Sequence, residues 1–246
     1  MLGLDPGLLA LAAAVAFLAA IVGGLSGFGV GLVLPPFLAA LVGVEGVVPT
    51  MATAALIINI SRFTAYRRAV DWKVARTLIL TVLPATAIGA TVYTWLPADA
   101  IALLLGTFLI AAVPLRRALA RHHFVPGGRT FAALGLGFGL LTGLTSGGSV
   151  ILIAGLMTAG LAGATLVATD AAISTATNLL RVAIYGADGL VTLQRGVAGI
   201  VVGLAAVPAA FIARLLMDRI PLHAHTRIME ALVIAGGISF LWRAWA

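Results

Sequence analysis

The stretch "GGLSGFGVGLVLPP" at residues 23–36 interrupts the first long apolar segment of the chain. It holds five glycines, one serine and two prolines, which are residue types that unwind or end helices. In lipid, backbone polar groups are tolerated outside helices only where protein buries them or where they line a wet cavity. The stretch therefore predicts a helical hairpin with an unwound segment at membrane depth.

The composition excludes an ordinary soluble domain. Of the 246 residues, 62% are hydrophobic and only 9% are charged, whereas a soluble domain carries about 25% charged residues. We therefore predict an all-α polytopic membrane protein with the lipid bilayer as its solvent. The net charge of +7 falls largely in short loops, so it indicates membrane orientation and not nucleic-acid binding.

The residues that carry metal and covalent chemistry are missing or badly placed. The chain has no cysteine, which excludes thiolate metal sites and cysteine nucleophiles. Its histidines lie in basic loops, at His122, His123, His223 and His225. We therefore expect no metal, no cofactor and no enzymatic activity.

The chain repeats itself after 119 residues. This shift places Thr50 on Thr169, Asn59 on Asn178, Arg62 on Arg181 and Tyr66 on Tyr185. Polar matches in an apolar background indicate a duplication. We predict two repeats, each a broken re-entrant helical hairpin followed by three transmembrane helices. The first repeat, 1–120, would comprise hairpin 8–43 and helices 47–66, 75–96 and 98–116. The second, 121–246, would comprise hairpin 131–161 and helices 163–186, 195–217 and 224–243.

The hairpin of the second repeat is too short to cross twice. Its arms, 131–144 and 149–161, flank the glycine-rich stretch "TGLTSGGS". An arm of about 13 residues spans about 20 Å of a core that is about 30 Å thick. We therefore predict two half-length helices that enter and leave on the same side.

Loop charge sets the orientation. Loops 67–74 and 116–129 are rich in Arg and Lys, whereas the turn near Asp99 has no basic residue. The positive-inside rule makes both basic loops cytoplasmic in a bacterial cytoplasmic (inner) membrane. The basic segment 214–227 would then be cytoplasmic too, which inverts the second repeat relative to the first.

The two glycine-rich breaks are candidates for an anion site. A half-helix that starts at a break presents unpaired N–H groups and the positive end of its dipole. The candidate residues are Ser26, Gly27 and Gly29 in the first break, and Thr145, Ser146, Gly147, Gly148 and Ser149 in the second. The alternative is that these glycines only let helices pack closely.

A second constellation, Asn-x-x-Arg-x-x-x-Tyr, occurs once in each repeat. Helical spacing places Asn59 with Arg62, and Asn178 with Arg181, within about 60° on one helix face. The planar fork of Arg suits the paired oxygens of a sulfonate, sulfite or carboxylate. The alternative is that both arginines lie near helix ends and snorkel to the headgroups.

Asp170 is the acidic residue expected at membrane depth. It lies about 16 Å along its helix from Arg181, too far for a direct pair. It either titrates with a coupling proton or pairs with a neighbouring helix, and we favour the pairing.

These motifs resemble the sulfite exporter TauE/SafE family over nearly the whole chain. The resemblance lies in "SGFGVGLVLPPFLAALVG" at 26–43, "AYRRAVDWKVA" at 65–75 and "WLPADAIALLLGTFLIAAVPLRR" at 95–117. The chain departs from the family in a thinned glycine triplet and in the lack of a second Val-Asp-Trp. The resemblance implies transport of small sulfur-containing oxyanions or organosulfonates, usually outward.

The predicted function is a secondary transporter that exports sulfite or an organosulfonate such as sulfoacetate. An anion channel, a permease for another small carboxylate or oxyanion, an intramembrane enzyme and a membrane scaffold are the alternatives. The expected partners are a small anion and the bilayer, without nucleic acid, and the oligomeric state is left open, a homodimer being one arrangement.

Overall fold

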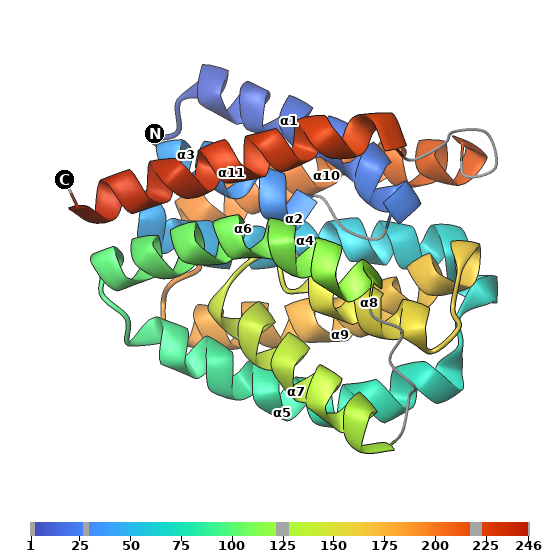
Figure 1. Cartoon of the computed structure of the whole chain (residues 1–246). Coiled ribbons are helices and arrows are strands. Elements are labelled where there is room, and N and C mark those ends of the chain that lie inside the picture. Colours follow the sequence, from blue (N-terminus) through green and yellow to red (C-terminus); the bar gives the residue numbers. More distant parts are fainter. Residues whose placement is uncertain (1–2, 27–29, 122–127, 217–222, 246) are drawn as a thin grey trace.

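Helices form all the secondary structure of residues 3–26, 30–121, 128–216 and 223–245, which are the residues that the computed structural model describes (Figure 1). They are α1 (Pro6–Ser26), α2 (Val30–Val33), α3 (Pro35–Val42), α4 (Val44–Tyr66), the short 3₁₀ helix η1 (Arg67–Ala69), α5 (Trp72–Thr94), α6 (Ala98–Arg121), α7 (Gly128–Leu144), α8 (Ser149–Thr158), α9 (Gly163–Ala187), α10 (Leu193–Leu216) and α11 (His223–Trp245). The all-α prediction is confirmed.

Five of these helices, α1, α4, α5, α6 and α10, are long and apolar enough to cross a membrane. Helix α9 has 25 residues but is not one of the five, because polar side chains interrupt its apolar sequence. Those polar residues include Asp170, Asn178 and Arg181, and all three are buried. Helix α9 therefore carries polar groups into the protein and not toward lipid.

Two predicted boundaries differ from those in the structure. The helix expected at 75–96 begins at Trp72, because the Asp71 carboxylate accepts hydrogen bonds from the Lys73 and Val74 N–H groups, a typical N-cap. Both ends of the segment expected as the basic loop 116–129 are helical, since α6 continues to Arg121 and α7 begins at Gly128.

In both hairpins the second arm is shorter than the first. Helix α1 has 21 residues, whereas its returning arm is divided into α2 and α3 at Pro35, which stands at the start of α3 where its missing N–H costs nothing. In the second hairpin, α7 has 17 residues and α8 has 10. Helix α8 is therefore only about 15 Å long, half the thickness of the hydrocarbon core.

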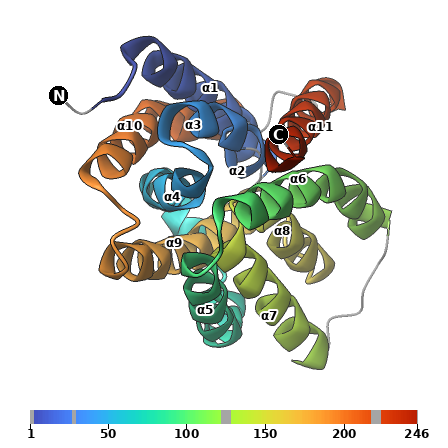
Figure 2. The ribbon, with the colours of Figure 1, turned by 90° about the vertical axis from the view of Figure 1, so that its left-hand side faces the viewer.

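Helices α4 and α9 pack against each other in the middle of the bundle (Figure 1). Figure 2 shows α1 and α10 on one side of this pair and α5 and α7 on the other. Helix α6 packs against α11. The predicted repeat relates α1 to α7, α4 to α9, α5 to α10 and α6 to α11. Replacing each helix by its counterpart gives the same set of helix pairs. The pairing is what the predicted duplication requires, and the duplication itself stays a prediction.

Glycines on α7 allow very close contact with α5. A Cβ added to Gly135 would overlap the Thr81 side chain, and one added to Gly139 would overlap the Val82 carbonyl. Close packing of small residues is common between membrane helices. The packing interpretation therefore holds for these glycines, which precede the break.

Candidate functional site

The second break meets α2, the short helix that follows the first break, inside the protein. The Ser146 hydroxyl, between α7 and α8, donates a hydrogen bond of 2.9 Å to the Gly31 carbonyl in α2. A Cβ on Gly31 would overlap the Ser146 carbonyl, so the backbones approach more closely there than any side chain would allow. Of the predicted residues in the first break, Ser26 ends α1, and Gly27 and Gly29 lie outside the described residues.

A pocket of about 60 Å³ lies where the breaks face α4 and α9. One water needs about 10–15 Å³ of such space, so the pocket has room for a group of several non-hydrogen atoms. The predicted residues that line it are Asn59, Arg62, Ser146, Gly148, Ser149, Asn178 and Arg181. The structure therefore brings both halves of the prediction, the breaks and the Asn–Arg stripes, to one place.

Arg181 is the more enclosed of the two arginines, with 2% of its surface exposed. Its Nη1 donates to Asn178 Oδ1 at 2.8 Å, and its Nη2 donates to the Thr145 carbonyl at 3.0 Å. Its Nε has no hydrogen-bond partner among the described residues. The guanidinium also lies over the Tyr185 ring, 5.7 Å from the centroid, and the Tyr185 hydroxyl donates to the Gly143 carbonyl. The second break and α9 thus hold Arg181 from two sides.

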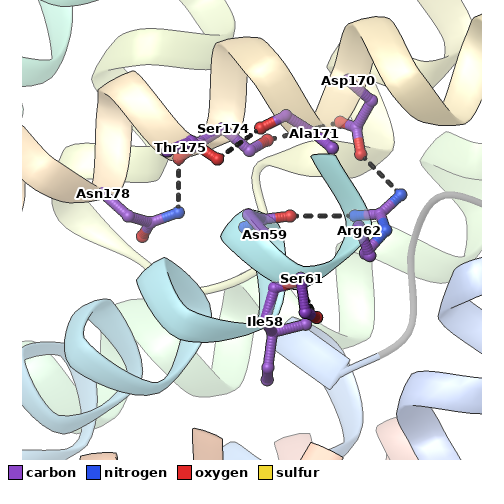
Figure 3. Close-up of polar contacts among 9 residues, drawn as sticks. All are labelled: Ile58, Asn59, Ser61, Arg62, Asp170, Ala171, Ser174, Thr175 and Asn178. Atoms are coloured by element: carbon purple, nitrogen blue, oxygen red, sulfur yellow. Dashed lines mark hydrogen bonds and ion pairs between the residues drawn. The ribbon is translucent and has the colours of Figure 1, made fainter. Parts of the chain in front are cut away.

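Arg62 has a carboxylate partner. Its Nη2 lies 2.9 Å from Asp170 Oδ2, and its Nη1 donates to Asn59 Oδ1 at 3.0 Å (Figure 3). Asp170 is fully buried, and its Oδ1 accepts from the Ser174 hydroxyl at 3.4 Å. The expected pairing of Asp170 with a neighbouring helix is confirmed, and the partner is Arg62 on α4.

The snorkelling alternative is wrong for both arginines. Arg62 is 7% exposed and Arg181 is 2% exposed, and both guanidinium groups line the pocket. A snorkelling side chain would extend its charge to the headgroups. Both charges instead remain inside the protein, where they attract an anion more strongly than they would in water.

Two predicted residues of the second break do not line the pocket. Thr145 is buried, its carbonyl holds Arg181, and its hydroxyl donates to the Leu141 carbonyl at 2.7 Å. Gly147 packs so closely on Leu32 and Phe108 that a Cβ would strike both side chains. Thr145 and Gly147 therefore support the residues around the pocket without lining it.

Gly148 and Ser149 bring the start of α8 to the pocket. A Cβ on Gly148 would overlap Thr142 Oγ1, so a glycine is required by close approach. The Val150 and Ile151 N–H groups already donate to the Gly147 and Gly148 carbonyls, so this end of α8 brings Ser149 and the positive end of the helix dipole to the pocket.

Two polar residues of the pocket, Thr142 and Ser174, were not among the predicted site residues. Thr142 is buried, lines the pocket, and its Oγ1 has no partner in the described part of the chain. Its signal was its place at the start of "TGLTSGGS". Ser174 also lines the pocket, and its signal was the helical spacing from Asp170 along the polar stripe of α9.

A model of the family described as "Sulfite exporter TauE/SafE" matches residues 12–240. Because the match covers nearly all of the 246 residues, the chain belongs to this family, as the sequence motifs predicted. It is accordingly a multi-pass membrane permease of a family that handles sulfur-containing anions. No curated protein and no solved structure matches the chain.

Proposed function

We propose that this member of the family is a secondary transporter that exports sulfite or an organosulfonate such as sulfoacetate across a bacterial cytoplasmic membrane. The observation that carries the proposal is the setting of Arg181. Its guanidinium lines a small pocket, neutral oxygens of Asn178 and Thr145 hold it, and no carboxylate pairs with it in the part of the chain that the structure describes. A buried cation in such surroundings is stabilised by a bound anion.

The size and chemistry of the pocket support a small oxyanion group. A volume of about 60 Å³ suits a sulfonate or sulfite better than a large molecule. The hydroxyl groups of Thr142 and Ser149 are donors for its oxygens, and the positive end of the α8 dipole favours its charge. Family membership supports sulfur as the central atom, because charge and size alone suit a carboxylate or phosphate equally well.

The position of the pocket supports a carrier. It lies between α4 and α9, which the predicted duplication makes counterparts, and transporters built from inverted repeats hold their substrate at the repeat interface near the midplane. Under the positive-inside rule, Arg67 and Arg68 in η1 and Lys73 in the first turn of α5 face the cytoplasm, and Asp99 at the start of α6 faces outward. The substrate would therefore pass from the cytoplasmic side to the outer side by alternating access.

The test is flux in proteoliposomes. Purified protein should take up labelled sulfite or sulfoacetate with saturation, and unlabelled substrate trapped inside should accelerate uptake of label by counterflow. Arg181→Ala is the matched control and should abolish this flux while the protein stays folded. Unitary currents without counterflow would identify an anion channel instead. Absence of any saturable sulfite or sulfonate flux would contradict the proposal.

A further inference from the structure

The two arginines of the pocket stand in unequal surroundings, although the repeat makes them counterparts. Arg62 meets the Asp170 carboxylate at 2.9 Å. The shift of 119 residues that relates Arg62 to Arg181 relates Asp170 to position 51, which is Met51. Met51 is buried and lines the pocket together with Arg181. By the predicted repeat, the position that corresponds to the Asp170 carboxylate is therefore held by a thioether in the wall of the same pocket.

The same shift shows that other pocket positions are unequal. Thr142 corresponds to Gly23 (142 − 119), and Ser149 corresponds to Val30 (149 − 119). All four residues line the pocket. The hydroxyl groups of the pocket thus come from the second repeat, and at the corresponding positions the first repeat contributes Gly23 and Val30. A bound anion consequently does not meet the same groups on the two sides of the pocket.

Burial makes the difference between the arginines an energetic one. A guanidinium removed from water needs a counter-charge or a full set of hydrogen bonds. Arg62 receives a counter-charge from Asp170. Arg181 receives two neutral acceptors and, among the described residues, no carboxylate. The side of Arg181 that faces the pocket therefore has an anion position that the chain itself does not fill.

We propose that the charged group of the substrate binds to Arg181 beside Met51, in the position that the Asp170 carboxylate occupies at Arg62. Asp170 is then a specificity-determining residue that does not touch the substrate. Asp170 neutralises Arg62, so the pocket retains one uncompensated positive charge, that of Arg181. A singly charged sulfonate group would neutralise it. This inference rests on the proposed function and assigns its substrate to one half of the pocket.

An isosteric pair of variants at position 51 tests the assignment. Met51→Asp places a carboxylate in the wall of the pocket that Arg181 also lines, whereas Met51→Asn has the same shape without the charge. Binding of methanesulfonate to the purified full chain is measured by titration calorimetry. We expect Met51→Asp to bind at least about tenfold more weakly than Met51→Asn, because an internal carboxylate then competes for the buried cation. Equal affinities of the two variants would overturn the inference.

The outcome is separable from a failure of the proposed function. A wild-type protein that neither binds nor transports any sulfite or sulfonate overturns the proposed function itself. A wild-type protein that transports sulfonates while the Met51→Asp and Met51→Asn variants bind equally overturns only the assignment to Arg181 and Met51.

A second test does not depend on the folding of Met51→Asp. Arg181→Met should weaken methanesulfonate binding by about ten- to a hundredfold, the size expected when a charged hydrogen bond is lost. Adding Asp170→Asn to Arg181→Met should restore at least about tenfold of that loss, because Arg62 then faces an amide in place of a carboxylate. The double variant keeps the same net charge at the site as the wild type. Wild-type affinity in Arg181→Met, or no gain in the double variant, would contradict the proposal.

Discussion

Arg62 Nη2 lies 2.9 Å from Asp170 Oδ2 and so joins the two central helices, α4 and α9, by an ion pair inside the protein. Asn59 accepts a hydrogen bond from the same guanidinium, and Ser174 donates one to the same carboxylate (Figure 3). Both helices also supply the walls of the pocket. The pair therefore fixes the relative position of the two halves of the site.

Removing one member of this pair should destabilise the protein. Asp170→Leu or Arg62→Met leaves the other charge buried without its partner, at a cost of about 3–5 kcal/mol. The double variant Arg62→Met/Asp170→Leu should recover most of this loss, because an apolar pair of similar volume avoids the desolvation of two charges. Reversible unfolding in mixed detergent measures all three. Additive losses in the double variant would show that the two residues act independently.

Gly148 should tolerate no side chain. Gly148→Ala places a Cβ on Thr142 Oγ1, so it should displace a residue of the pocket wall and reduce substrate flux by about tenfold or more, since an overpacked site costs about 1–3 kcal/mol. Gly137→Ala on α7 is the matched control, because nothing lies within 4 Å of a Cβ at that position. Flux measured in proteoliposomes should be normal for Gly137→Ala. Equal flux in both variants would assign Gly148 no role in shaping the pocket.

The contact between α5 and α7 should depend on Gly139. A Cβ there would overlap the Val82 carbonyl and approach the Ala85 Cβ to 2.8 Å. Gly139→Ala should therefore lower the free energy of unfolding by about 1–3 kcal/mol, as overpacking does elsewhere. Thermal unfolding in detergent checks this, again with Gly137→Ala as reference. A stabilised Gly139→Ala protein would mean that the two helices can separate without loss.

The sequence was sufficient for the features that depend on local chemistry. The break at 145–148 follows from the cluster of small residues there, and the helices around it follow from apolar length. The partner of Asp170 could not be named in the same way. Helical rise excluded Arg181, but the choice of Arg62 depends on how α4 and α9 rotate against each other. Thr142 was missed because a threonine within a helix usually bonds to its own backbone.

Orientation can be checked with single cysteines, since the chain contains none. Ala69→Cys, in the basic turn between α4 and α5, should resist an impermeant thiol reagent in intact cells. Asp99→Cys, at the exposed start of α6, should react readily. The physical reason is the excess of Arg and Lys around position 69. Reaction at position 69 combined with protection at position 99 would reverse the proposed topology.

Substitutions of Arg181 show whether substrate binding needs only its positive charge or also the planar geometry of its guanidinium group. Its Nη1 and Nη2 donate to two fixed acceptors on different elements, Asn178 Oδ1 on α9 and the Thr145 carbonyl in the break. A lysine ammonium keeps the charge but is a single point on a flexible stem, so it does not reach both acceptors with the same geometry. Arg181→Lys should therefore bind sulfonates more weakly than the wild type. Arg181→Ala should bind still more weakly, by about 1.5–3 kcal/mol relative to the wild type.

The same two substitutions at Arg62 should behave differently. Its fork serves Asn59 and Asp170, so Arg62→Lys and Arg62→Ala should lower the free energy of unfolding more than they lower substrate affinity. Affinity from titration calorimetry and stability from detergent unfolding are measured for all four variants. We expect the loss of affinity to follow position 181 and the loss of stability to follow position 62. Equal affinity for Arg and Lys at position 181 would move the anion site to the glycine breaks, where backbone N–H groups and hydroxyls bind without a fork.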